Sequence, residues 1–296
     1  MEKELLVYID GNYYPKSQAK ISVYDHGLLY GDGVFEGIRA YNGIVFKLKE
    51  HIDRLYRSAH TIMLQIPVQK EEMINIVLET LRRNSLKDSY IRLVITRGVG
   101  DLGLNPKKCL KPTVIVITDT IALHKSETKE KGATAMLSWV KRDPVDATTH
   151  EIKSLNYLNS ILAKIEANIN DVDEAICLDK NGCVCEGVAE NIFIVTDGSI
   201  FTPPSYAGAL PGITAEVVIK LARKLGYEVA EKNITPYELF NADEVFFTGT
   251  AAEIVPVREI NKRQIGKGKP GPVTKKLMEE FSKLVQSPSE GIPIYK

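Results

Sequence analysis

Three short stretches of the sequence hold residue types that could do nucleophilic chemistry beside a bound anion. Lys153 lies just before a helical segment in a stretch poor in other charges, where burial would free its amine as a nucleophile. Residues 211–214, Pro-Gly-Ile-Thr, open an amphipathic helix, and a helix N-terminus offers N–H groups and a positive dipole end to an anion. Residues 249–252, Gly-Thr-Ala-Ala, are small enough for backbone N–H groups to approach a phosphate closely. Each signal alone is weak, because a single lysine is usually a solvated surface residue.

Other chemical motifs are incomplete or missing from the sequence. Residues 98–103 match the Gly-x-Gly-x-x-Gly dinucleotide pattern, but Leu104-Asn105-Pro106 follows. The residue before a proline avoids the helical region, so no helix opens there to meet a pyrophosphate. There is no Walker loop, no His-Glu-x-x-His and no Gly-x-Ser-x-Gly. The 5 histidines and 4 cysteines show no metal-ligand spacing, so we predict no metal site and reduced thiols.

Length and charge narrow the class of protein. A chain of 296 residues predicts about two domains, and 44% hydrophobic with 26% charged residues is typical of a globular protein. Lys plus Arg and Asp plus Glu are both 38, which argues against a nucleic acid or an anionic membrane as partner. No apolar run approaches the ~20 residues of a membrane span, and the first ten residues do not resemble a signal peptide. We therefore expect a cytoplasmic protein that acts on small molecules.

Hydrophobic periodicity predicts the elements that must position these residues. In the first half we expect strands over 4–9, 44–48, 90–96 and 113–118, and helices over 50–64 and 70–83. In the second half, Asn-Gly and Asp-Gly turns predict the strand pairs 175–179 with the strand from 183, and 191–196 with 199–202. Further helices are expected over 158–169, 213–225 and 273–285.

Strands and helices mix without strict alternation, which predicts an α+β fold rather than a doubly wound sheet. The polar residues 124–135 predict an interdomain linker, although a charged surface helix or loop fits them equally well. The expected domains are residues 1–123 and residues 136–296.

Six segments dense in small, polar and aromatic residues follow one another along the chain: 30–39, 90–92, 151–157, 186–191, 210–214 and 248–254. As an ordered set they closely resemble the class IV aminotransferases, the fold-type-IV enzymes that use pyridoxal 5′-phosphate, and most of all the branched-chain amino acid aminotransferases. The resemblance runs from about residue 4 to about residue 275. It implies a small α/β sandwich as N-terminal domain and a larger pseudo-barrel C-terminal domain that carries the cofactor lysine.

The resemblance also implies roles around the cofactor. Lys153 would form the internal aldimine and would be the catalytic residue that moves the proton. Glu186 would pair with the pyridine nitrogen, where a carboxylate favours the protonated ring. Arg54 would bind the phosphate through its guanidinium fork. Further cofactor contacts would come from Tyr157, Leu210, Gly212, Ile213, Thr214 and Thr250.

The family's substrate positions match Tyr30, Phe35, Gly37, Tyr90, Arg92, Thr250 and Ala251. Aromatic walls suit an aliphatic side chain. By resemblance, Tyr90 and the N–H groups near Ala251 would hold the α-carboxylate, and Arg92 would receive the distal carboxylate of glutamate. The segment around Tyr30 would reach the neighbouring subunit's site, which implies a homodimer as the minimal unit and leaves a trimer of dimers open.

The implied reaction is ping-pong transamination between leucine, isoleucine or valine and 2-oxoglutarate, giving branched-chain 2-oxo acids and L-glutamate. Tyr90, Arg92 and residues 249–254 favour these substrates. Lys153-Ser154-Leu155-Asn156 is similar to the D-amino-acid aminotransferases of the same fold, so that activity stays open, as does an aminodeoxychorismate-type lyase. A binding protein without catalysis is disfavoured because the lysine is present.

Overall fold

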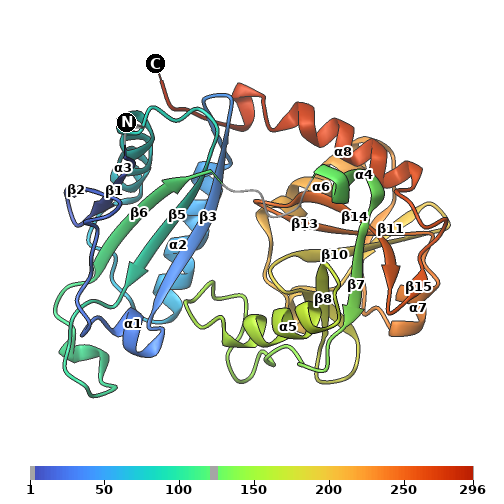
Figure 1. Ribbon diagram of the computed structural model, residues 1–296, viewed down its shortest axis with the longest axis horizontal. Coiled ribbons are helices and arrows are strands. Elements are labelled where there is room, and N and C mark those ends of the chain that lie inside the picture. The colour runs from blue at the N-terminus through green and yellow to red at the C-terminus, as the bar shows by residue number, and fades with distance from the viewer. Residues whose placement is uncertain (1–3, 121–125, 296) are drawn as a thin grey trace. The chain divides into compact units, whose positions relative to one another are not determined.

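The computed structural model describes residues 4–120 and 126–295, which fold into two compact units (Figure 1). Unit 1 comprises Met1–Ile121, Ile152–Asn156 and Leu284–Lys296. Unit 2 comprises Ala122–Glu151 and Tyr157–Lys283. No helix among the described residues is both long enough and apolar enough to cross a membrane.

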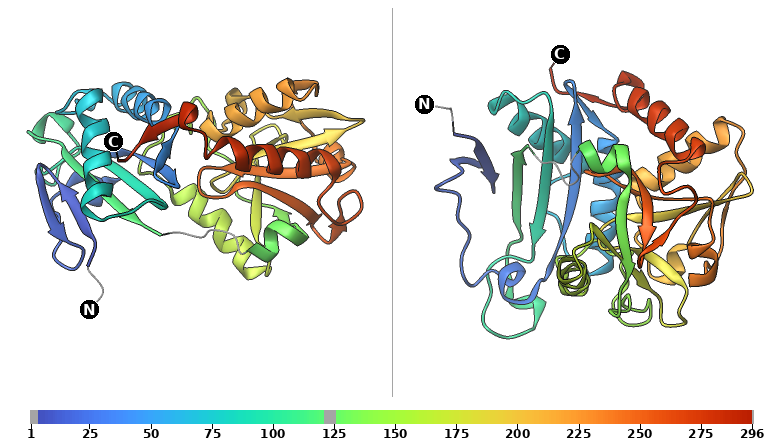
Figure 2. Two further views of the ribbon diagram at one scale, coloured as in Figure 1. Left: turned by 90° about the horizontal axis from the view of Figure 1, so that it is seen from above. Right: turned by 45° about the vertical axis from the view of Figure 1, so that its right-hand side comes forward.

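Unit 1 is a seven-stranded antiparallel sheet covered on one face by two helices (Figures 1 and 2). The strand order is β16-β4-β3-β5-β6-β1-β2. The strands are β1 (Leu6–Ile9), β2 (Asn12–Pro15), β3 (Gly33–Tyr41), β4 (Ile44–Phe46), β5 (Ser89–Thr96), β6 (Thr113–Asp119) and β16 (Gly291–Pro293). The helices are α1 (His26–Tyr30), α2 (Leu48–Thr61) and α3 (Lys70–Arg83), with short turns η1 (Pro106–Lys108) and η3 (Pro288–Glu290).

The core of unit 1 lies between this sheet and helices α2 and α3. Helix α2 buries Leu48, Ile52, Leu55 and Ala59, whose spacing places them on one stripe of a helix. That stripe packs against buried strand residues such as Ile38 of β3. Helix α2 is therefore fixed against β3, and the polar residues on its sheet-facing side are fixed with it.

Unit 2 is built on a nine-stranded mixed sheet in the order β12-β11-β10-β13-β14-β7-β8-β9, with β15 paired to β14. The strands are β7 (Ala133–Leu137), β8 (Glu174–Leu178), β9 (Val184–Gly187), β10 (Asn191–Thr196), β11 (Ser199–Thr202), β12 (Val229–Glu231), β13 (Glu244–Gly249), β14 (Glu253–Ile260) and β15 (Arg263–Gln264). Strand β9, at one end of the order, also contacts β10 near the other end, so the sheet curls towards a barrel.

Five helices accompany this sheet: α4 (Ser126–Lys131), α5 (Leu158–Ile169), α6 (Ile213–Lys224), α7 (Pro236–Phe240) and α8 (Pro272–Leu284). A short turn, η2 (Ser205–Ala207), precedes α6. The two units together confirm the predicted α+β, fold-type-IV architecture.

The domain boundaries differ from the prediction of residues 1–123, a linker over 124–135 and residues 136–296. Residues 126–131 form α4 and β7 begins at Ala133, so the linker from 126 onward belongs to unit 2, while residues 124 and 125 lie outside the described residues. Residues 152–156 and 284–296 belong to unit 1. The reason is packing: Ile152 lies against the unit 1 core, Ser154 bridges Val34, and β16 pairs with β4.

Candidate active site

The residues predicted to carry the chemistry fall into one set in each unit. The first, which we name the Lys153 group, consists of Phe35, Gly37, Arg54, Tyr90, Arg92 and Lys153 in unit 1. The second, the Glu186 group, consists of Tyr157, Glu186, Leu210, Gly212, Ile213, Thr214, Thr250 and Ala251 in unit 2. Each group is described by itself below.

Lys153 is held along the start of β3 by backbone hydrogen bonds. Its N–H donates to the Ser58 hydroxyl at 3.2 Å, and its carbonyl accepts from the Phe35 N–H at 3.0 Å. Its Nζ lies 4.7 Å from the centre of the Phe35 ring, within the range of a cation–π contact. The amine of Lys153 is thus half-buried against an aromatic face, with its backbone tied to both β3 and α2.

The predicted substrate residues of β3 and β5 meet around a single arginine. Gly37 is paired with Arg92 across the two strands. The Arg92 guanidinium lies 4.5 Å from the Phe35 ring centre and 5.5 Å from that of Tyr90. A Cβ added at Gly37 would overlap the Tyr90 hydroxyl, so the Tyr90 side chain lies across this glycine. The result is an aromatic surface over which the Arg92 guanidinium lies.

Arg54 of α2 forms a buried ion pair with Glu36 of β3. Its Nε donates to Glu36 Oε1 at 2.7 Å and its Nη2 to Oε2 at 2.8 Å, while His51 Nδ1 lies 2.8 Å from the same Oε2. All three residues are at most 4% exposed. Burial alone would raise the pKa of Glu36, but Arg54 and His51 outweigh it and hold that pKa well below its usual range. Burial lowers the pKa of His51, with Glu36 opposing the shift.

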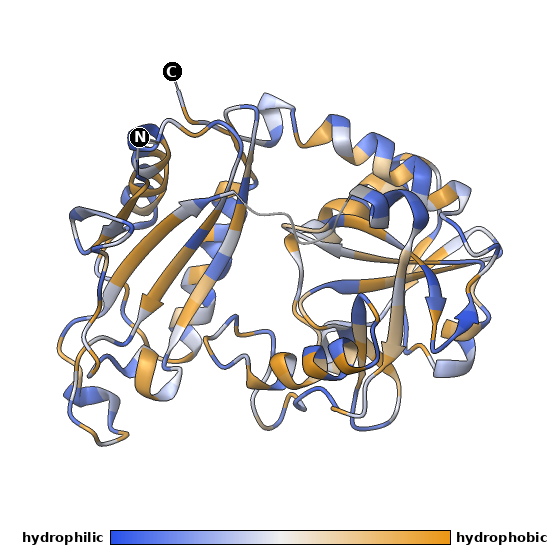
Figure 3. Ribbon diagram, viewed as in Figure 1, coloured by the Kyte–Doolittle hydropathy of each residue, from blue (hydrophilic) through white to orange (hydrophobic). Residues whose placement is uncertain are grey.

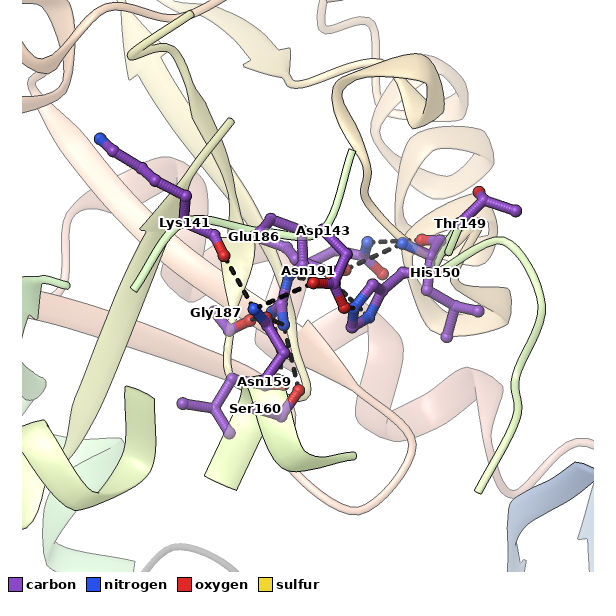
Figure 4. Close-up of polar contacts among 12 residues, drawn as sticks. Lys141, Asp143, Thr149, His150, Asn159, Ser160, Glu186, Gly187 and Asn191 are labelled. Carbon is purple, nitrogen blue, oxygen red and sulfur yellow. Dashed lines mark hydrogen bonds and ion pairs between the residues drawn. The ribbon is translucent and has the colours of Figure 1, made fainter. Parts of the chain in front are cut away.

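Glu186 of β9 is anchored at both carboxylate oxygens (Figure 4). Oε2 accepts from the Leu210 N–H at 2.9 Å. Oε1 lies 3.2 Å from Nε of Arg142, close enough for an ion pair although not aligned as a hydrogen bond. His150 Nδ1 is 3.9 Å from the same oxygen, and its Nε2 is 3.2 Å from Asp143. The carboxylate therefore has a cation beside it and a fixed direction.

Arg142 ties Glu186 to helix α5. Its Nη1 donates to Asn159 Oδ1 at 2.9 Å and to Ser160 Oγ at 3.0 Å, and its Nη2 donates to the Gly187 carbonyl at 2.5 Å. Burial would lower the pKa of Arg142, but Glu186 together with Cys177, Cys185 and Tyr157 outweighs it, and the pKa lies above its usual value. Tyr157, at the start of α5, also acts electrostatically on Arg142. The Arg142 guanidinium therefore lies beside the Glu186 carboxylate and is held there by α5 and Gly187.

The N-terminus of α6 begins without a side-chain cap. Gly212 is its N-cap, and no side chain accepts a hydrogen bond there, which leaves the first N–H groups of Ile213 and Thr214 for another acceptor. Asn191 donates to the Leu210 carbonyl at 2.8 Å, and a Cβ at Gly212 would overlap its amide oxygen. The cap thus packs tightly on the start of β10.

The turn carrying Thr250 and Ala251 follows β13, next to that cap. Asn191 is paired with Thr248 across β10 and β13, so the Leu210–Gly212 segment and the start of the turn flank the same residue. The Thr248 hydroxyl is buried with no hydrogen-bond partner among the described residues. Parts of three predicted segments of the sequence, 186–191, 210–214 and 248–254, are therefore brought together.

Tyr30 is placed differently from the rest of the predicted substrate residues. It ends α1, its hydroxyl donates to the Leu102 carbonyl at 2.6 Å, and its ring meets the edge of His26. These contacts fix Tyr30 against the loop that follows β5.

Within the described residues, no group of three or more His, Cys, Asp or Glu side chains is arranged to hold a metal ion.

The sequence arguments missed four residues that shape these groups: Glu36, His51, Arg142 and Asn191. Glu36, His51 and Asn191 stand inside or beside predicted motifs, but the motif gave them no role. No sequence motif identifies Arg142, because the residues to which its side chain donates, Asn159 and Gly187, lie 17 and 45 positions further along the chain.

Comparisons with known proteins agree with the architecture and with each other. A Methanocaldococcus jannaschii protein, provisionally named a branched-chain-amino-acid aminotransferase, is 56% identical over 278 residues, covering 94% of this chain and 96% of that protein. The branched-chain-amino-acid aminotransferase of Escherichia coli strain K12 is 39% identical over 290 residues, covering 96% and 94%. The T.th. branched-chain amino acid aminotransferase complexed with N-(5′-phosphopyridoxyl)-L-glutamate has a TM-score of 0.93 at 40% identity, covering 99% of both chains.

The family model described as Amino-transferase class IV matches residues 33–260, a range that contains every residue of the Lys153 and Glu186 groups. Tyr30 belongs to neither group and lies before this range. With the match covering most of the chain and relatives this similar, the chain belongs to the class IV aminotransferases, a family of pyridoxal-phosphate enzymes.

Proposed function

We propose that this enzyme moves the amino group between branched-chain L-amino acids and 2-oxoglutarate, with pyridoxal 5′-phosphate as cofactor. In the full reaction, the donor's amino group and α-hydrogen are exchanged for the carbonyl oxygen of the acceptor. The observation that carries the proposal is Arg92, whose guanidinium lies over both the Phe35 ring and the Tyr90 ring. An aliphatic side chain suits the rings, and the distal carboxylate of glutamate suits the guanidinium.

The side chains present fit this cofactor. Lys153 offers an amine against an aromatic ring, Glu186 offers a buried carboxylate, and the N-terminus of α6 has no side-chain cap. We assign Lys153 to the cofactor's aldehyde carbon, Glu186 to the pyridine nitrogen, and Arg54, Ile213, Thr214 and Thr250 to the phosphate. When bound, the cofactor supplies an electron sink for the α-carbon of the substrate.

Lys153 is also the residue that we expect to move the proton at the substrate α-carbon, acting first as a base and then as an acid. Its neighbours support this role, because the Phe35 face shields the amine and the Ser58 and Phe35 backbone contacts fix its starting point. Glu186 would pair with the pyridine nitrogen, and its carboxylate is held for that role by the neighbouring Arg142 and the Leu210 N–H.

The Lys153 and Glu186 groups also offer residues to bind the α-carboxylate and the side chain of an amino acid substrate. Tyr90 and the N–H groups near Ala251 are proposed to hold the α-carboxylate, while Phe35 and the surface opened by Gly37 receive the side chain. Tyr157 is assigned to the phenolic oxygen of the cofactor, Leu210 to its ring, and Gly212 to the close approach of the phosphate. The solved complex of the T.th. enzyme with a phosphopyridoxyl-glutamate conjugate supports glutamate as one partner.

We propose that the enzyme works as a homodimer, with Tyr30 contributed to the partner's site. Helix α5, which carries many hydrophobic residues (Figure 3), supports a second copy as partner because residues on both its buried and its exposed side are apolar. One side is buried through Ser160, Ala163 and Ala167. The other exposes large side chains at helical spacing: Leu158, Ile161, Leu162, Ile165 and Ile169. A helix with two apolar faces is normally buried on both. The cytoplasmic location and a trimer of dimers stay predictions.

The test is a comparison of amino donors with the purified holoenzyme. We expect L-leucine, L-isoleucine and L-valine to convert 2-oxoglutarate into L-glutamate, and Lys153→Ala to abolish the reaction. Preference for D-alanine would replace the proposal with a D-amino-acid aminotransferase. Release of pyruvate from aminodeoxychorismate without any acceptor would replace it with a lyase. Rapid turnover by Lys153→Ala would refute the assignment of the catalytic lysine.

A further inference from the structure

The buried ion pair beneath β3 calls for an explanation beyond stability. Replacing a buried ion pair by apolar side chains of similar volume is often neutral or stabilising, yet Glu36 is fully buried and Arg54 is 4% exposed. Glu36 alternates along β3 with Phe35 and Gly37, so its side chain lies on the opposite face of the strand. One strand thus carries substrate positions on one face and a carboxylate against α2 on the other.

The geometry around Glu36 fixes the plane of the Arg54 guanidinium. Two parallel hydrogen bonds of 2.7 Å and 2.8 Å join Nε and Nη2 to the two carboxylate oxygens, which is the fork arrangement that defines a guanidinium plane. His51 Nδ1, at 2.8 Å from Oε2, stops the carboxylate from rotating. Because Nε and Nη2 face Glu36, the edge that carries Nη1 is turned to the opposite side.

We propose that Glu36, braced by His51, is a positioning residue that orients Arg54 towards the 5′-phosphate and so sets the preference for the phosphorylated cofactor. The inference rests on the proposed function, in which Arg54 binds that phosphate. Glu36 itself touches neither cofactor nor substrate. It acts through Arg54, and its negative charge offsets the cation, so recognition depends on directed N–H groups rather than on net charge.

The chain offers a matched control for a buried carboxylate. Glu244, 7% exposed, accepts hydrogen bonds from the N–H groups of Val273 and Thr274 and from the Thr274 hydroxyl, at 3.0, 2.8 and 2.6 Å. It holds the start of α8 and contacts no residue of the Lys153 group in these hydrogen bonds. Glu244→Gln therefore reports the cost of neutralising a buried carboxylate without any phosphate role.

The experiment measures dissociation constants of the apoenzyme for pyridoxamine 5′-phosphate and for pyridoxamine by titration calorimetry. The readout is the dissociation constant for pyridoxamine divided by that for pyridoxamine 5′-phosphate, a ratio that a loss of folded protein alone does not change. We expect Glu36→Gln to weaken pyridoxamine 5′-phosphate about tenfold or more, as expected for a lost charge-assisted hydrogen bond, and to leave pyridoxamine unchanged. His51→Leu should lower the ratio in the same direction, and His51→Asn, whose amide can replace Nδ1 as donor, should restore it.

Three outcomes separate this inference from the proposed function. A ratio lowered in Glu36→Gln and His51→Leu, but not in Glu244→Gln, supports it. If Arg54→Gln lowers the ratio while the Glu36 and His51 variants do not, the positioning role is overturned and the proposed function stands. If Arg54→Gln also leaves the ratio unchanged, the assignment of Arg54 to the phosphate fails. Should Glu36→Gln not fold, the His51 pair alone decides.

Discussion

Removing the Arg142 side chain from its buried contact with Glu186 should strongly lower the free energy of unfolding. Arg142→Met keeps most of the side-chain volume and removes the charge. The Arg142 side chain is 0% exposed and that of Glu186 is 6% exposed. Breaking a buried ion pair by removing one partner costs about 3–5 kcal/mol. The variant also leaves the Gly187 carbonyl without the donor at 2.5 Å, so the upper part of that range is expected.

For a unit of this size, each kcal/mol lowers the melting temperature by about 2–4 °C, so a loss on the order of 10 °C is expected for the apoenzyme. The assay is differential scanning calorimetry of the apoenzyme. Arg142→Lys keeps a charge but cannot contact Asn159, Ser160 and Gly187 together. Its melting temperature should therefore lie between those of the wild type and Arg142→Met. Lys141→Met is the matched control: this neighbour is exposed and should change stability by less than about 0.5 kcal/mol. An Arg142→Met protein that melts within about 2 °C of wild type would refute the reasoning.

Three further changes test other parts of the structure. Gly37→Ala places a methyl group on the Tyr90 hydroxyl, so KM for the amino donor should rise while the visible spectrum of the bound cofactor stays unchanged; an unchanged KM contradicts the placement of Tyr90. Gly212→Ala pushes against the Asn191 amide that holds Leu210, and losing one such hydrogen bond should weaken cofactor binding on the order of tenfold in equilibrium dialysis; full retention argues against a phosphate at this cap. Burial, with repulsion from Glu190, raises the pKa of Glu174 above its ordinary 4.5, so ionising Glu174 destabilises the fold as pH rises. Glu174→Gln, always neutral, should therefore melt progressively higher than wild type between about pH 5 and about pH 8, and a constant difference refutes this sign.

Hydrophobic periodicity and turn residues were sufficient to predict the bounds of elements that have one dominant sequence pattern. Helices α3 and α5 and strands β10 and β11 have the predicted bounds, because in each an apolar segment of the right spacing or length ends at a turn or at polar residues. Strand β3 was not predicted as a strand. Its glycines and the charged Glu36 and Arg39 interrupt the alternation, since both of its faces carry polar side chains that the fold buries or half-buries.

The candidate site was assembled from the resemblance rather than from periodicity. The structure brings most of those residues into the two groups, but it adds partners that no local pattern contains. Glu36 and Arg54 are 18 positions apart, and Arg142 and Gly187 are 45 apart. Such contacts depend on the tertiary packing of β3 against α2 and of β9 near α5. A sequence motif identifies the residues expected to contact the ligand. The residues that position those side chains are determined by tertiary packing.

The most direct test of the central claim is the visible absorption spectrum of the purified holoenzyme during one half-reaction. We predict that L-leucine, added without an acceptor, removes the absorption band of the bound cofactor and that 2-oxoglutarate then restores it, with D-alanine producing no change. Lys153→Ala should show neither response at a comparable rate. A protein whose spectrum changes only with D-alanine would contradict the substrate assignment, and one that binds no pyridoxal phosphate would contradict the account of both residue groups.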